Sequence, residues 1–213
     1  VHLQDSEYGL KSRLLTYFSE ADSGIAEGNV EFVQKGQTIT AGKVTYVKET
    51  NDAASYRAEE DVIIREEERT ATCGLTIYDA LSDISKLLDN PVVVQEGQEL
   101  SGEEIHLRYE EDKLAKLTIP SRAHIVYKRE GKTNGTEGDE SILSEFLDDM
   151  TGQRLEAFLE EGLLDSVRLQ GMATTLYHLF EDSVYQGKNI ASGDTITLLF
   201  EADSTETRDV NSI

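Results

Sequence analysis

Two short residue patterns alternate along this chain, and their regular spacing constrains the fold more than any other feature of the sequence. In the first pattern, a small residue is followed three and five positions later by residues that are usually apolar. Its copies are Gly9/Ser12/Leu14, Ala41/Val44/Tyr46, Thr72/Leu75/Ile77, Gly102/Ile105/Leu107, Gly152/Leu155/Ala157 and Gly193/Ile196/Leu198. In the second pattern, an apolar residue is followed four positions later by Val or Ala and then, two positions on, by one more residue. Its copies are Ala26/Val30/Phe32, Ala58/Val62/Ile64, Leu88/Val92/Val94, Ile119/Ala123/Ile125 and Leu169/Ala173/Thr175.

Copies of the second pattern recur at intervals of about 31 residues, with one longer interval before the last copy. A period of this size indicates units that cannot bury their own apolar face and therefore stack on their neighbours. Because apolar residues alternate with other residues inside each copy, the copies are typical of β-strands. The sequence therefore predicts an all-β protein in which each unit contributes two strands and two turns.

The period slips at two places, and both predict departures from the regular array. Residues 131–140 carry Gly, Thr, Asn and acidic residues without an apolar side chain, which indicates a surface excursion at about 131–150. A second extension around residues 181–189 is interpreted as another loop. The next copy of the second pattern would fall near position 214. We therefore expect one domain over residues 1–213 with an incomplete last repeat.

Two segments place apolar residues at helical spacing and so compete with the all-β prediction. They are residues 79–88 and residues 141–162. The repeat register assigns Leu88 and Leu155 to strands, and equivalent positions in other units show no helical pattern. We therefore predict strands at both residues and a short helix only near residues 144–149.

The charge of the chain excludes one large class of partners. The formal net charge is −22, with 20 basic residues dispersed among 42 acidic ones. Nucleic-acid binding depends on Lys and Arg that neutralise phosphates, so no nucleic-acid partner is expected. A solvated acidic surface and divalent-cation binding both remain open, although no acidic run has the spacing of a calcium loop.

The sequence offers little support for catalysis or for a cofactor. The four His residues lack the spacing of zinc sites, so no metal is predicted, and the nucleophile-elbow and P-loop motifs are absent. Carboxylates are so numerous that any pair chosen for glycan cleavage is uninformative. The single Cys73 excludes an internal disulfide and is expected to be a buried, inert thiol. No stretch has the length of a membrane helix or the form of a secretory signal, so any signal is expected to have been removed.

Several of these segments resemble a known family. Residues 26–32 and 37–46 are similar to the repeat of OstA-like proteins, the family of the periplasmic lipopolysaccharide-transport protein LptA, its partner LptC and the N-terminal domain of LptD. Residues 152–158, 171–177, 187–189 and 192–200 resemble the second half of OstA-like proteins from Bacteroidota. The likeness covers nearly the whole chain. Which of the three kinds of protein this chain is remains open.

The resemblance implies a folded-over antiparallel β-jelly roll, shaped like a taco, whose apolar interior shields lipid acyl chains. It also implies a non-enzymatic carrier of lipopolysaccharide in the periplasm of a Gram-negative bacterium. Molecules of this family join head to tail through edge strands, either as homo-oligomers or with other OstA-like domains. Here the expected edges are residues 9–18 and residues 196–200, because unpaired edge strands are templates for added strands.

Apolar residues at the repeat positions are the candidates for the lipid groove. They are Val30, Phe32, Ile39, Val44, Tyr46, Val62, Ile64, Leu75, Ile77, Val92, Val94, Ile105 and Leu107. A strongly acidic protein cannot hold anionic phosphates by bulk attraction, so the headgroup stays in solvent, is bridged by divalent cations, or carries fewer phosphates. Any contact with the headgroup is assigned to the comparatively basic N-terminal region. The candidates are Lys11, Arg13, Lys35 and Lys43.

Two other functions remain open at this point. The chain could be a structural or adhesive envelope protein in which the same apolar residues form a dry core without lipid cargo. It could also be a glycan-active β-repeat enzyme, which would need carboxylates clustered in a surface groove.

Overall fold

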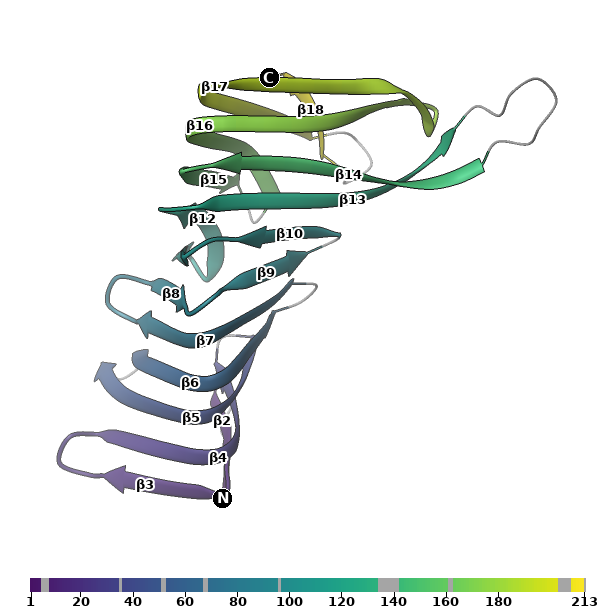
Figure 1. Cartoon of the computed structure of the whole chain (residues 1–213). Coiled ribbons are helices and arrows are strands. Elements are labelled where there is room, and N and C mark those ends of the chain that lie inside the picture. The colour runs from purple at the N-terminus through teal and green to yellow at the C-terminus, as the bar shows by residue number, and fades with distance from the viewer. Residues whose placement is uncertain are drawn as a thin grey trace.

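The computed structural model describes residues 1–4, 8–34, 36–50, 53–66, 69–95, 97–133, 142–160, 163–202 and 208–212. Within these ranges the chain forms one 18-stranded sheet and no helix, so the all-β prediction is confirmed (Figure 1). The strands are β1 (His2–Gln4), β2 (Tyr8–Lys11), β3 (Leu14–Phe18), β4 (Ser23–Gln34), β5 (Gln37–Thr50), β6 (Ala53–Glu66), β7 (Arg69–Asp79), β8 (Ile84–Leu88), β9 (Val92–Gln95), β10 (Gln98–Ser101), β11 (Glu104–Glu110), β12 (Lys113–Ile119), β13 (Ala123–Thr133), β14 (Ile142–Gly152), β15 (Arg154–Glu160), β16 (Leu163–Glu181), β17 (Val184–Ala202) and β18 (Arg208–Ser212).

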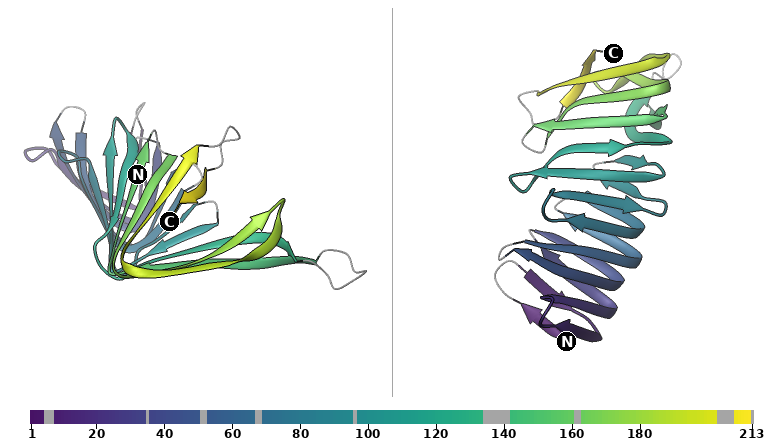
Figure 2. Two further views of the ribbon diagram at one scale, coloured as in Figure 1. Left: turned by 90° about the horizontal axis from the view of Figure 1, so that it is seen from above. Right: turned by 90° about the vertical axis from the view of Figure 1, so that its left-hand side faces the viewer.

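The sheet is folded over into two arms that meet in a V (Figure 2). The register shows how one strand serves both arms. Residues 75–79 of β7 pair with β8, whereas residues 69–72 of the same strand pair with β9. The first arm contains β3, β8, β11, β12, β15 and β18, and the second arm contains β1, β2, β9, β10, β13 and β14. Strands β4–β7, β16 and β17 cross from one arm to the other, so the predicted folded-over antiparallel architecture is confirmed.

Left-handed residues mark the corners at which the chain passes between the arms. Gly28 and Asn29 have φ values of 78° and 49°, and they interrupt the β4–β5 register. Glu60 and Asp61 do the same in β6, with φ values of 68° and 54°. A backbone hydrogen bond recurs between successive corners, for example from Arg13 N to Gly28 O at 3.0 Å. Gly and Asn adopt the left-handed conformation most easily. The left-handed pairs therefore mark where β4 and β6 bend from one arm into the other.

The two segments with helical spacing, residues 79–88 and 141–162, contain strands and no helix among the described residues. Leu88 and Leu155 lie in β8 and β15, as the repeat register predicts. The predicted short helix at residues 144–149 is wrong, because this segment lies in β14. β14 pairs with β13 from Gly152 to Ile142, and these cross-strand hydrogen bonds outweigh the local helical preference.

The two predicted loops are largely hairpins. β13 and β14 continue together as far as Thr133 and Ile142, so most of the excursion predicted at about 131–150 is strand, and residues 134–141 lie outside the described residues. The loop predicted at residues 181–189 is wrong, because β16 and β17 pair out to Glu181 and Val184. Only Asp182 and Ser183 form the turn between them.

The edges of the sheet differ in part from the prediction. At the N-terminal end β1 pairs with β2, so only the β3 half of residues 9–18 is an edge. At the other end β18 pairs with residues 199–202 of β17, so the predicted edge at residues 196–200 is partly covered. Residues 185–193 of β17 pair with β16 and with no other described strand. The single domain and its incomplete last repeat stay predictions.

Candidate functional site

The inner faces of the two arms carry apolar side chains in cross-strand rows that run along the whole length of the molecule. In the second arm the register joins ten strands through one row: Phe32, Ile39, Ile64, Ala71, Val93, Leu100, Ile125, Met150, Thr175 and Ala191. In the first arm a matching row consists of Leu15, Ala26, Val44, Ala58, Thr76, Leu87 and Ile105. Nearly all of these side chains are buried, and together they define the interior of the V.

Eight of the predicted groove residues lie in this interior. They are Val30, Phe32, Ile39, Val44, Val62, Ile64, Ile105 and Leu107, and none of their side chains is more than 7% exposed. Tyr46 is half-buried and packs against the same core. Contact of these residues with lipid stays a prediction.

Four predicted groove residues do not face the interior. Leu75 and Ile77 pair in register with Glu59 and Arg57, which places them on the outer face of the first arm. The inward residues of this part of β7 are Thr76, which is fully buried, and Tyr78.

Val92 and Val94 of β9 likewise point outward, and Val94 is 42% exposed. Their buried neighbours are Leu87 and Val93. The left-handed corner residues Asp89 and Asn90 set the register of this unit. The sequence repeat, which was aligned on Leu88 and Val92, was therefore displaced by one residue here. Because side chains alternate between the faces of a strand, a shift of one position reverses every assignment.

The four basic residues assigned to headgroup contact do not form a site at the opening of the V. Lys43 pairs with Glu27 and Glu59 on the outer face, and Arg13 lies beside Gly28 at a corner. Lys11 is exposed at the end of β2, and Lys35 lies outside the described residues. Lys11, like Lys43, has an acidic neighbour, because it pairs with Glu31 on the adjacent strand β4. The structure therefore brings Arg13 and Lys43 together only at the outer side of the corner.

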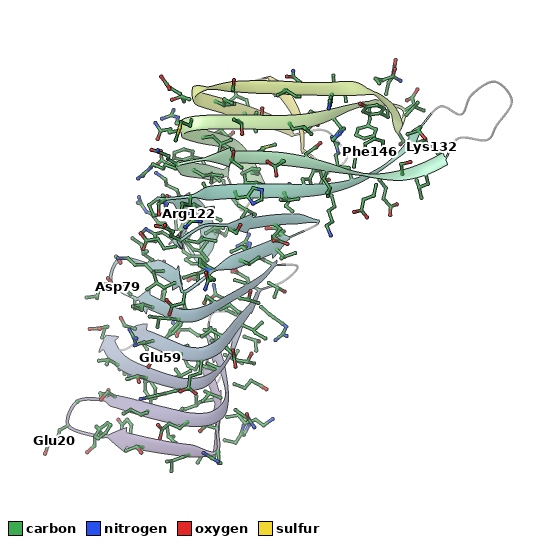
Figure 3. All side chains as sticks on the ribbon, viewed as in Figure 1. Glu20, Glu59, Asp79, Arg122, Lys132 and Phe146 are labelled. Atoms are coloured by element: carbon green, nitrogen blue, oxygen red, sulfur yellow. The ribbon has the colours of Figure 1, made fainter. Side chains whose placement is uncertain are left out.

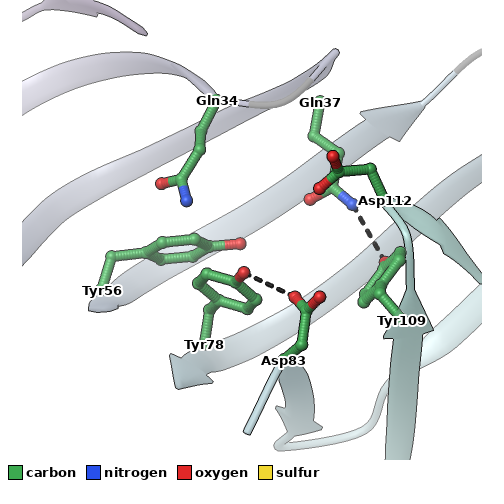
Figure 4. A pocket seen from close by; sticks show the side chains of 7 residues that line it. All are labelled: Gln34, Gln37, Tyr56, Tyr78, Asp83, Tyr109 and Asp112. Carbon is green, nitrogen blue, oxygen red and sulfur yellow. Dashed lines mark hydrogen bonds between the residues drawn. The ribbon is translucent and has the colours of Figure 1, made fainter. Parts of the chain in front are cut away.

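Polar side chains from the two arms meet near the open side of the V (Figure 4). Gln37 Nε2 in the second arm donates a hydrogen bond to Tyr109 Oη in the first arm at 3.0 Å. Gln34 Nε2, also in the second arm, donates to Ala54 O in the first arm at 3.5 Å. These contacts cross the opening and hold the arms together at this level.

Three tyrosines line the first-arm side of this junction. The ring of Tyr56 packs edge-on against Phe32, with 5.4 Å between the centroids, and lies 5.2 Å from the ring of Tyr78. Tyr78 Oη donates to Asp83 Oδ1 at 2.6 Å. Burial raises the pKa of both Tyr56 and Tyr109 above the usual value of a phenol. Both hydroxyls therefore stay protonated and neutral at physiological pH.

A second buried cluster lies where the β13–β14 and β16–β17 hairpins extend past the other strands, near the labelled Phe146 in Figure 3. Asp148 is fully buried, and its Oδ1 accepts the backbone N–H of His178 at 2.8 Å and lies 2.7 Å from Nδ1 of the same residue. Arg129 Nη1 lies 3.9 Å from Asp148 Oδ2. The ring of Phe146 stacks on Tyr185 at 4.9 Å.

This cluster was missed from the sequence because Phe146 and Asp148 lie in the predicted helix and Tyr185 lies in a predicted loop. The aromatic residue Tyr185 inside a supposed surface loop, next to Phe180, was the available signal. Half-buried rings in contact and a buried, paired carboxylate indicate packing between the two hairpins.

The remaining chemistry of the described residues is sparse. Cys73 is buried, and burial raises the pKa of its thiol to about 11, as expected for an unreactive cysteine. No group of three His, Cys, Asp or Glu side chains within the described ranges is arranged to hold a metal ion. The described part of the chain also contains no helix long and apolar enough to cross a membrane. The dominant feature is thus the apolar interior, which can exclude water from an apolar ligand.

Comparison with known proteins finds a similar family and a similar solved structure. One similar solved structure is the crystal structure of LptH from Pseudomonas aeruginosa, described as the LptA-homologous periplasmic component of the lipopolysaccharide transport device. It is 14% identical, with a TM-score of 0.47 over 65% of this chain and 93% of LptH. Among curated proteins no significant match is found. Residues 11–113 match the model of the family described as LptA/(LptD N-terminal domain) LPS transport protein. Through this segment, which is just under half of the chain, the protein is similar to the family of LptA and the LptD N-terminal domain.

Proposed function

We propose that this chain is a non-enzymatic carrier that holds the acyl chains of lipopolysaccharide between its two arms during transport across the periplasm. The family match supports a role in lipopolysaccharide transport. The observation that carries the finer proposal is the unbroken row of inward side chains from Phe32 to Ala191, which crosses ten strands of the second arm. An interior that is largely apolar along the array would accept a chain at many levels and pass it along.

The energetics of such an interior favour an acyl chain. Each methylene moved from water into apolar surroundings contributes about 0.8 kcal/mol. In the structure the interior side chains contact one another, and Ile39, Leu87 and Ile105 are fully buried. A bound chain would replace contacts between the arms with contacts to its own methylenes. Binding would require the arms to separate about the corners, where the strand register shifts at residues 27–30 and 59–62.

The charge of the chain supports a headgroup that lies outside this interior. A net charge of −22 repels phosphates, and the described basic candidates lie with acidic neighbours at the corner or on the outer face. The acyl chains would therefore be shielded while the anionic headgroup remains in solvent.

Assembly would use the open edges of the sheet. β3 at one end exposes Leu14, Tyr17 and Phe18, each more than 45% exposed. At the other end residues 185–193 of β17 offer a strand that pairs on one side within the described residues, and Ile190 there is 65% exposed. Addition of a strand at either edge would continue the apolar rows into a second OstA-like domain or a second copy.

Photo-crosslinking tests the carrier function directly. A photoreactive amino acid at Phe32 or Ile64 would face the interior, whereas the same group at the neighbouring Val33 or Ile63 would face outward. We expect lipopolysaccharide to be captured at the two inward positions in exporting cells and not at the two outward ones. Equal capture at all four positions, or none at the inward pair, would refute the proposal.

One observation also favours a structural envelope protein, namely the close packing of the interior. If the interior is a permanently dry core, the inward positions would crosslink to other parts of the same chain and never to lipid. The same experiment therefore separates the two functions.

A further inference from the structure

The interior contains a polar patch that the carrier function alone does not explain. Gln34 is 3% exposed and Tyr56 is 4% exposed, yet Gln34 Oε1 and Tyr56 Oη have no hydrogen-bond partner among the described residues. Figure 4 shows both side chains lining one pocket between the arms. A buried polar atom without a partner costs about 1–3 kcal/mol, so such atoms mark a place where something else binds.

We propose that Gln34 and Tyr56 form a subsite for a hydroxyl or amide group carried on an acyl chain. This inference rests on the carrier function proposed above and adds a chemical preference to it. Gln34 Oε1 requires a donor, and Tyr56 Oη can donate to an acceptor. A hydroxyl group is both donor and acceptor, and an amide carries both on adjacent atoms.

The position of the subsite suits a substituent on an otherwise apolar chain. Tyr56 packs against Phe32, which belongs to the apolar row of the second arm. Tyr56 also continues a first-arm row through Tyr78 and Ser85 to Leu107. A chain lying along the interior would thus pass the two unpaired atoms. The space left in the pocket is about that of one water molecule, which is also the size of a hydroxyl group.

The electrostatics of the pocket exclude an anionic group. Asp83 and Asp112 are both among the lining residues, and burial raises the pKa of Tyr56 and Tyr109. The nearby Ser85 hydroxyl lowers the pKa of Tyr56, but burial has the larger effect. Ser85 forms no hydrogen bond of ordinary geometry with Tyr56 Oη. An environment that opposes the formation of a phenolate also opposes a phosphate or carboxylate. The group that binds is therefore neutral.

Two fatty acids of equal length test the subsite. Tetradecanoic acid and 3-hydroxytetradecanoic acid, each as its uncharged methyl ester, would compete with a bound fluorescent fatty acid on the purified chain. We expect the hydroxylated ester to bind about fivefold more tightly, which corresponds to about 1 kcal/mol. Tyr56→Phe and Gln34→Leu are each expected to reduce this ratio to about one. Tyr17→Phe makes the same atom change on the exposed strand β3 and is expected to keep the ratio. Circular dichroism would verify that each variant is folded.

The possible results separate the two proposals. Equal affinity of the unaltered chain for both esters would overturn the subsite and leave the carrier function standing, because a single ordered water would then satisfy Gln34 and Tyr56. A preference that persists in both interior variants would also overturn the assignment to these residues. Failure of either ester to displace the probe would refute the carrier function and the subsite with it.

Discussion

Leu87 and Leu88 are adjacent in β8 and point to opposite faces of the sheet. Replacing each of them by Ala tests which of the two belongs to the core. The side chain of Leu87 is 0% exposed and pairs in register with Thr76 and Ile105 on the inner face. Leu88 is half-buried and pairs with Leu75 and Glu104 on the outer face. The repeat alignment assigns Leu88 to the pattern, whereas the structure assigns Leu87 to the core.

The magnitudes differ enough to decide between these assignments. Truncation of a fully buried Leu to Ala typically costs 2–5 kcal/mol, because transfer energy is lost and a cavity remains. For Leu87, whose neighbours are held by the corner at residues 89–90, we expect about 3 kcal/mol. For Leu88, which loses only part of its exposed surface on folding, we expect about 1 kcal/mol.

Urea unfolding followed by far-ultraviolet circular dichroism measures both changes. With an m-value of about 3 kcal/mol/M, Leu87→Ala should lower the midpoint by about 1 M and Leu88→Ala by about 0.3 M. The m-value must be the same in all three proteins for this comparison to hold. A larger loss for Leu88→Ala than for Leu87→Ala would refute the register described above and restore the alignment by sequence repeat.

Three further predictions concern other parts of the molecule. Asp148→Ala should lower the free energy of unfolding by about 3 kcal/mol in urea titrations, because it leaves the buried His178 N–H and ring without a partner. Gly102→Ala should destabilise by about 1–3 kcal/mol, because the added Cβ would collide with the buried side chain of Ile119. Cys73 should react with iodoacetamide at pH 8 at least about tenfold more slowly than in the unfolded chain. Since its pKa is raised from 9.0 to about 11, its contribution to stability should decline as the pH rises through this interval.

Each of these predictions has a control and a contrary outcome. Asp149→Ala removes the half-exposed neighbouring carboxylate, which pairs with His124, and should cost less than about 1 kcal/mol. A similar cost for Asp148→Ala would show that the paired carboxylate does not hold the hairpins together. A neutral Gly102→Ala would mean that the corner relaxes freely. Rapid alkylation of Cys73 in the folded protein, or a pH dependence unchanged in Cys73→Ala, would contradict its burial.

Two sets of contacts between distant strands were not predicted from the sequence repeat. The β13–β14 and β16–β17 hairpins extend past the array, and their packing depends on Arg129, Asp148 and His178 rather than on apolar alternation. Similarly, the arms meet through Gln37 and Tyr109 at the open side of the V. Neither set has a spacing in the sequence that predicts it, because the partners lie on different strands and meet only after the sheet has folded over.

The sequence by itself determined the all-β class, the two-strand unit and most of the interior. Val30, Ile39, Val44 and Val62 were identified because burial on one face of a strand requires alternation, and alternation is visible in a single sequence. Strands at Leu88 and Leu155 followed from the same period.

Only the tertiary structure decided the register of the third unit and the form of the extensions. Near Val92 apolar residues occur on both faces, and near Leu75 the inward position holds Thr76, so alternation there does not distinguish inside from outside. The left-handed corner at Asp89 and Asn90 sets the face instead. Residues 144–149 have helical spacing, but pairing with β13 supplies backbone hydrogen bonds that local preference cannot match. The facing of side chains in the third unit and the strand at residues 144–149 therefore depend on contacts between distant strands, which a local sequence pattern does not contain.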